Sequence, residues 1–149
     1  MTSRVLAIAS GGGHWVQLLR MRQAFADRDV AFCTVRDGYR AEIGDARFHV
    51  VPDANRWDKL GLVRTAWAVL RVVMGERPDI VVSTGAAPGL FGIAFGKLLG
   101  ARTIWVDSIA NAETLSLSGR QARRFADLWL TQWPHLAADD GPFYKGSVL

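Results

Sequence analysis

The chain has 149 residues, enough for one domain; half of them are apolar and about a fifth are charged. This composition is ordinary for a globular domain and excludes a disordered or low-complexity protein. The net charge of +4 favours anionic partners, but it does not distinguish phosphates, acidic lipid surfaces and nucleic acid.

Alternating strand and helix patterns follow one another along the chain. In chain order, we expect a strand at 4–9, a helix at 15–25, strands at 30–35 and 48–51, the longest helix at 59–74, a strand at 80–83, an apolar helix at 90–99, a strand at 103–106, a short basic helix at 119–125 and a strand at 128–131. No repeat or linker interrupts them, which predicts a single domain over residues 1–149. Repeated strand–helix units with apolar strands indicate an α/β fold, a Rossmann-like parallel sheet with helices on both faces.

The single cysteine and the apolar stretches indicate in which compartment the protein lies and whether it crosses a membrane. Cys33 lies in an apolar run, so an internal disulfide or a CxxC metal pair is excluded, and we expect a buried structural thiol in a reducing compartment. No segment resembles a signal peptide, and the apolar stretches at 60–74 and 90–99 are too short or too charged to span a bilayer. We therefore expect a chain that does not cross a membrane, which leaves binding to a membrane surface open.

Ligands of such sheets bind beyond the carboxyl ends of the strands, which points to three loops, at residues 10–14, 84–89 and 107–118. The first loop consists of Ser10, Gly11, Gly12, Gly13 and His14. Its glycines allow a ligand to approach the backbone, and the helix start behind them offers unpaired amides that suit a phosphate. The dinucleotide-binding fingerprint would need a glycine where the chain has Val16.

His14 stands at the start of the helix, where the dipole disfavours an imidazolium. A neutral ring there could act as a base or donate to a phosphate oxygen; a ring that only caps the helix is the alternative. The second loop, with Thr84 and Gly85 at its beginning, repeats the arrangement of strand, small residues and helix start. Together the two loops could hold a diphosphate, whereas the second loop alone could be an ordinary turn.

The helix expected at 59–74 has an unusual surface. Arg64 and Arg71 lie seven residues apart on one face, and Trp67 lies between them. An aromatic residue at the border of apolar and basic side chains suits a bilayer interface, so we predict that these three residues face a membrane. A core helix with two solvated arginines is the alternative. Arg120, Arg123 and Arg124 share a face of the later helix, which could meet headgroups, a diphosphate or an acidic partner, or only solvent.

The third loop and the segment after it carry the most specific pattern. Residues 106–120 read VDSIANAETLSLSGR, residues 127–136 read DLWLTQWPHL, and residues 144–146 read YKG. Together with the first two loops, this pattern resembles the membrane-anchoring subunit of the two-subunit UDP-N-acetylglucosamine transferase of asparagine-linked glycosylation. It also resembles the bacterial capsule and exopolysaccharide relatives of that subunit, over nearly the whole chain.

The resemblance implies the N-terminal half of a GT-B glycosyltransferase that binds a polyprenyl-diphosphate-linked acceptor at the membrane. A separate donor-binding subunit would supply the other half of the enzyme and most of the UDP-sugar site. We expect no metal, no permanently bound cofactor and no nucleic acid. The acceptor diphosphate site is expected at Ser10, Gly11, Gly12, Gly13, His14, Thr84, Gly85, Ser116 and Ser118. His14 is the first candidate base by position, with Asp107 and Glu113 as alternatives, and any of the three could instead only orient the acceptor.

Two departures from the family pattern qualify this prediction. The family usually has Glu where this chain has Asp107, and Asp keeps the negative charge on a shorter side chain. The family also usually has Arg near the position of Ala110 or Asn111. Eukaryotic members carry an amino-terminal transmembrane anchor that this sequence lacks, so we expect a bacterial, peripheral member at the cytoplasmic face of the inner membrane. Two alternatives stay open: a self-sufficient Rossmann-type nucleotide-binding enzyme, and a non-catalytic scaffold that recruits a complete transferase to membranes.

Overall fold

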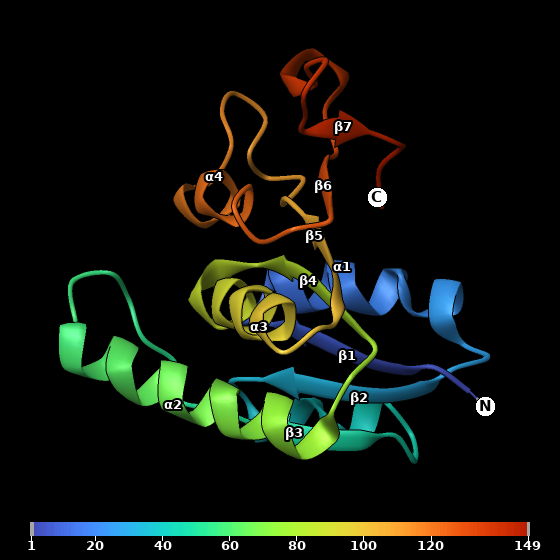
Figure 1. The fold of residues 1–149 in the computed structure, drawn as a ribbon, viewed down its shortest axis with the longest axis vertical. Coiled ribbons are helices and arrows are strands. Elements are labelled where there is room, and N and C mark those ends of the chain that lie inside the picture. The colour runs from blue at the N-terminus through green and yellow to red at the C-terminus, as the bar shows by residue number, and fades with distance from the viewer. Residues whose placement is uncertain (1, 149) are drawn as a thin grey trace.

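Seven parallel strands form one sheet in the computed structural model, which describes residues 2–148 (Figure 1). Their order across the sheet is β3-β2-β1-β4-β5-β6-β7. The strands are β1 (Arg4–Ala9), β2 (Asp29–Thr34), β3 (Arg47–Val50), β4 (Ile80–Gly85), β5 (Arg102–Val106), β6 (Leu128–Thr131) and β7 (Phe143–Tyr144). The α-helices are α1 (Gly13–Arg20), α2 (Lys59–Glu76), α3 (Ala86–Leu98) and α4 (Leu117–Ala122), and the 3₁₀ helices are η1 (Arg22–Phe25), η2 (Asp37–Glu42) and η3 (Pro134–Leu136).

Both faces of the sheet are covered, as the apolar strands require. On β1, Leu6 and Ile8 point to a core shared with α2, α3 and α4. The alternate residues Val5, Ala7 and Ala9 point to a second core formed with α1, η1 and η2. The predicted parallel sheet with helices on both faces is therefore confirmed. Cys33 is buried in the first core, where burial raises the pKa of its thiol to about 12.

Two of the three loops predicted to bind ligands, those after β1 and β4, leave the sheet at its topological switch point. Strand β1 lies between β2 and β4, so the chain turns in opposite directions from neighbouring strands there. The loops after β1 and β4 therefore diverge and leave a crevice at the carboxyl ends of the strands. Within residues 2–148, no helix combines the length and the hydropathy that crossing a bilayer requires.

Several element boundaries differ from those predicted from the sequence. The helix expected at 90–99 begins at Ala86, so residues 86–89 of the second loop are helical. The helix expected at 15–25 divides at Met21 into α1 and η1, and the one expected at 119–125 begins two residues earlier, at Leu117. Helix α2 extends to Glu76 because Arg77, in the left-handed conformation (φ 49°), ends it before Pro78. The pattern of the sequence did not predict η2, η3 or β7.

Candidate functional site

The first two loops meet directly, through His14 and Thr84. The Nδ1 atom of His14 lies 3.1 Å from the carbonyl oxygen of Thr84, and the hydroxyl of Thr84 donates to the carbonyl oxygen of His14 at 2.6 Å. Thr84 is fully buried, whereas His14 is partly exposed. The two contacts fix the start of α1 against the end of β4.

An irregularity of the sheet makes this contact possible. Ile8 pairs with Ser83 and the next residue, Ala9, pairs with Gly85, so that Thr84 is left out of the register. A bulge of this kind re-aims the extra residue. Gly85 follows with a φ of 148°, and a Cβ atom there would lie only 2.2 Å from Nδ1 of His14. The glycine is therefore needed both for the backbone conformation and for the space that the histidine ring occupies.

The hydrogen bond to Thr84 also determines the tautomer of His14. A carbonyl oxygen can only accept, so Nδ1 of His14 carries the proton and donates it to this bond. The neutral ring then has its lone pair on Nε2. A ring oriented by one nitrogen and basic at the other has the arrangement required of a general base.

A cavity of about 600 Å³ lies beside this histidine, at the carboxyl edge of the sheet. It is lined by residues from the starts of α3 and α4, the third loop and the segment that precedes α2. Its lining residues are His14, Ala54, Asn55, Arg56, Leu62, Ala86, Ala87, Leu90, Phe91, Ser108, Ala110, Asn111, Ser116, Leu117, Ser118 and Gln121. Ala86 adopts a φ of 65°, which is rare for a residue with a Cβ atom and typical of functional sites.

The predicted diphosphate-binding residues divide into two groups around this cavity. His14, Ser116 and Ser118 line it. The three glycines of the first loop do not: the amide of Gly12 donates to the hydroxyl of Tyr39 at 3.0 Å, and Gly11 packs near Arg36. The buried residues Ser10 and Thr84 and the glycine Gly85 lie behind the wall, and the amide of Gly85 donates to the hydroxyl of Ser83 at 3.1 Å. Ala86 and Ala87, the first residues of α3, line the cavity, and their amides have no acceptor within the helix.

Asp107, an alternative candidate base, is only 1% exposed and does not line the cavity. Its carboxylate accepts hydrogen bonds from the indole of Trp105 (3.1 Å) and from the amide (3.0 Å) and hydroxyl (2.6 Å) of Ser116. Ser116 in turn caps α4 by accepting from the amide of Gly119. These contacts make Asp107 a positioning residue that ties the third loop to β5. Glu113, the other alternative, is exposed on the third loop and is not part of the cavity wall.

The segment at 132–135 holds the third loop from the opposite side. Gln132 donates to the carbonyl oxygen of Asp107 at 2.9 Å, and Trp133 donates to the carbonyl oxygen of Ile109 at 2.7 Å. The Nε2 atom of His135 lies 2.5 Å from the carbonyl oxygen of Ala112. Gln17, on α1, also accepts from Gln132 and from the amide of Ile109, and donates to the hydroxyl of Ser108. Sequence reasoning recognised this segment only as part of a family pattern. The structure shows why the two stretches occur together: one clamps the other.

The residues predicted to face a membrane lie together on the outer surface of α2. Arg64 and Arg71 are exposed, and Trp67 is 61% exposed. The same surface presents three further large apolar side chains, those of Leu60, Val63 and Met74. The opposite side of the helix packs into the core through Thr65, Val69 and Val73. Exposed apolar side chains on this scale are unusual for a solvated helix.

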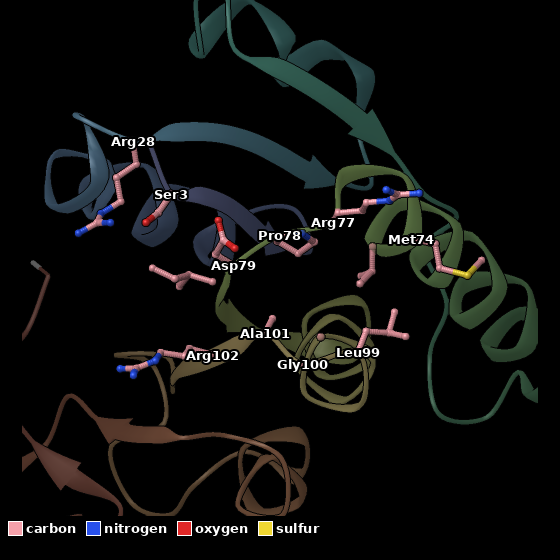
Figure 2. Close-up of a pocket in the computed structure, with 13 residues that line it drawn as sticks. Ser3, Arg28, Met74, Arg77, Pro78, Asp79, Leu99, Gly100, Ala101 and Arg102 are labelled. Carbon is pink, nitrogen blue, oxygen red and sulfur yellow. The ribbon is translucent and has the colours of Figure 1, made fainter. Parts of the chain in front are cut away.

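A larger concavity, of about 1060 Å³, lies at the amino edge of the sheet, away from the three loops (Figure 2). Arg28, Arg77 and Arg102 stand at its rim. Figure 2 shows that Arg77 extends toward α2, whereas Arg28 and Arg102 extend in the opposite direction. Because the three guanidinium groups do not converge, they do not form an anion site, and the carboxyl-edge cavity is the better candidate.

Comparison with known proteins assigns the family. Residues 59–147 match the family described as "Oligosaccharide biosynthesis protein Alg14 like". The chain belongs to this family. It is 30% identical to the UDP-N-acetylglucosamine transferase subunit ALG14 of Eremothecium gossypii, over 89% of this chain and 74% of that protein. The ALG14 subunit of Mus musculus is 25% identical, over 89% of this chain and 76% of that protein.

Solved structures agree with this family on the fold. MurG of Acinetobacter baumannii superposes with a TM-score of 0.75 at 14% identity, over 97% of this chain and 45% of MurG. UDP-N-acetylglucosamine 2-epimerase of Rickettsia bellii gives a TM-score of 0.73 at 15% identity, over 99% of this chain and 46% of the epimerase. This Alg14-like chain thus has the fold of one half of the GT-B architecture and spans less than half the length of either protein.

Proposed function

We propose that this chain is the acceptor-binding half of a heteromeric glycosyltransferase. The assembled enzyme would transfer a sugar from a UDP-sugar to a polyprenyl-diphosphate-linked acceptor, in capsule, exopolysaccharide or lipid-linked oligosaccharide biosynthesis. The observation that carries the proposal is the cavity at the switch point, beside a histidine whose Nδ1 donates to Thr84. The names of the curated relatives, which are subunits of a UDP-N-acetylglucosamine transferase, support it.

In this proposal the partner subunit supplies the other half of the GT-B cleft and holds most of the UDP-sugar. The acceptor lies in the carboxyl-edge cavity with its hydroxyl near Nε2 of His14. As the hydroxyl oxygen bonds to C1 of the sugar, the bond from C1 to UDP breaks and the configuration inverts. Nε2 takes the hydroxyl proton, and the bond from Nδ1 to Thr84 holds the ring while it is charged. Asp107 and the segment at 132–135 shape the wall without touching the acceptor.

The acceptor is a lipid, so the proposal requires a membrane surface beside the cavity. We assign Arg64, Trp67 and Arg71 to that surface, at the cytoplasmic face of the inner membrane. Their exposure on α2, together with exposed Leu60 and Val63, supports the assignment. Trp67→Ala combined with Arg64→Gln and Arg71→Gln is expected to reduce sedimentation with vesicles of phosphatidylethanolamine and phosphatidylglycerol. Undiminished sedimentation would refute this surface while leaving the acceptor site in place.

The decisive experiment reconstitutes the enzyme. The chain is co-expressed with a candidate donor-binding subunit, purified by pull-down, and assayed with a panel of UDP-sugars and a polyprenyl-diphosphate acceptor. We expect turnover by the pair, none by the chain alone, and a loss of about 100-fold or more in the pair with His14→Ala. Full activity of the isolated chain would mean a self-sufficient enzyme. Unchanged turnover of the pairs with His14→Ala and Glu113→Ala would instead mean a scaffold.

A further inference from the structure

The cavity at the carboxyl edge has a distinctive charge pattern. Among its lining residues, Arg56 is the one with a permanent charge, and no carboxylate lies in the wall that residues 2–148 form. The remainder of the wall is apolar or carries hydroxyl and amide groups. A single cation in such a wall favours an anionic group of the ligand over a neutral or cationic one.

Arg56 is held in place by a structured turn. The side-chain oxygen of Asn55 accepts from the amide of Trp57 at 2.9 Å, and the carbonyl oxygen of Asn55 accepts from the amide of Asp58 at 3.1 Å. The guanidinium of Arg56 lies 4.7 Å from the centre of the Trp57 ring. The turn therefore places the backbone of Arg56 at the cavity, and the Trp57 ring contacts its guanidinium.

No neighbouring carboxylate neutralises Arg56. The carboxylate of Asp58 caps α2 by accepting from the amide of Gly61 at 2.9 Å. None of the ion pairs formed within residues 2–148 includes Arg56. Its five N–H donors remain available in the planar arrangement that binds two phosphate oxygens at once.

The surroundings of Arg56 indicate which anion it binds. Trp57, the next residue along the chain, is 80% exposed, and Leu60, in the first turn of α2, is 64% exposed, so exposed apolar side chains follow Arg56 in the chain. Leu62, Leu90 and Phe91 extend this apolar surface along the cavity wall. An amphiphile with a charged head and a hydrocarbon tail matches this combination of a cation and neighbouring apolar side chains, whereas a nucleotide has no hydrocarbon tail.

We infer that Arg56 binds the diphosphate of the lipid-linked acceptor, while Trp57 and Leu60 receive the start of its hydrocarbon chain. This assignment rests on the proposed function and adds to it a residue outside both helix-start loops. Phosphate recognition in this cavity then depends on a side-chain cation as well as on backbone amides. His14 and Arg56, which both line the cavity, would contact the acceptor at its reacting and its charged end.

The test measures binding of geranylgeranyl diphosphate to the full chain by titration calorimetry, with UDP as the alternative source of a diphosphate. We compare the wild type with Arg56→Gln and Arg56→Lys, and with Arg28→Gln as the matched control. Arg28 is also exposed, but it lies at the amino edge of the sheet. We expect Arg56→Gln to weaken binding of the lipid by about tenfold or more, Arg56→Lys to recover part of the loss, and Arg28→Gln to bind as the wild type does.

Each other outcome has a distinct meaning. Equal binding of the lipid by the wild type and Arg56→Gln would overturn the assignment of Arg56 and leave the proposed function standing. Failure of the wild type to bind the lipid would count against the acceptor role itself. If UDP bound as tightly as the lipid and this binding were lost in Arg56→Gln, Arg56 would belong to the donor site. That result would overturn the lipid assignment. Because Arg56 is exposed, thermal melting of its variants should match that of the wild type, which separates loss of binding from loss of fold.

Discussion

Replacing Gly85 with Ala tests whether the position of His14 matters for function. The new Cβ atom would lie 2.2 Å from Nδ1 and 2.5 Å from Cε1 of the ring, and ordinary contacts begin at 3.4 Å. The ring therefore has to move by about 1.2 Å, which breaks its hydrogen bond to Thr84. A displacement of about 1 Å in a reacting group costs on the order of 100-fold in rate. The φ of 148° adds strain for any residue with a Cβ atom, about 1–3 kcal/mol.

Gly100→Ala separates the two effects. Gly100 also has a positive φ, of 94°, but a Cβ atom there would meet nothing within 4 Å. We expect both variants to melt at a lower temperature, by roughly 5 °C, and only Gly85→Ala to lose about 100-fold in turnover of the assembled pair. The imidazole resonances of His14 should shift in Gly85→Ala alone. A Gly85→Ala pair as active as the Gly100→Ala pair would refute a catalytic use of the ring position.

Three further predictions concern the scaffold around the site. Asp107→Ala leaves three donors without their acceptor and should destabilise the fold by about 3 kcal/mol in denaturant titration; lost turnover with unchanged stability would instead indicate a base. Trp133→Phe removes the donor to Ile109, so amide hydrogen exchange should accelerate at 109–113, and unchanged exchange would contradict the clamp. The hydrogen bond from Lys97 lowers the pKa of Asp127, so the stability lost in Lys97→Met should be constant above pH 5 and shrink below about pH 4; a loss that persists undiminished at pH 3 would contradict it.

The local pattern of apolar and polar residues in the sequence predicted much of the fold. The strands at 4–9 and 128–131 were predicted with the bounds that the structure has, because buried parallel strands are short apolar runs bounded by turn residues. The start of α3 was predicted four residues too late. Ala86, Ala87 and Pro88 read as a loop, although Pro costs nothing in the first turn of a helix, where its missing amide has no acceptor to lose. The two-residue strand β7 carries no pattern that sequence reasoning can detect, since it exists only through its pairing with β6.

The candidate site was predictable only in outline. The rule that ligands bind beyond the carboxyl ends of parallel strands placed the first and second loops at the same edge correctly, because the order of strand and helix patterns determines which loops leave the sheet at that edge. This rule could not predict that the amide of Gly12 donates to the hydroxyl of Tyr39, or that the turn before α2 places Arg56 in the cavity wall. Both contacts depend on how segments distant in the sequence pack, and neither follows a local period.

Part of the sequence pattern of the third loop has a structural cause. Its backbone is fixed at both ends of the cavity wall: Asp107 holds Ser116 from one side, and Trp133 and His135 hold the carbonyl oxygens at 109 and 112 from the other. Residues 110 and 111, which lie between those two carbonyl groups, line the cavity. The side-chain contacts that fix the loop are made by other residues. Substitutions at 110 and 111 would therefore change the cavity wall without removing the hydrogen bonds that hold the loop. We therefore expect the choice of acceptor to be set at positions 110 and 111, where this chain has Ala and Asn, rather than at the more distinctive residues that hold the loop.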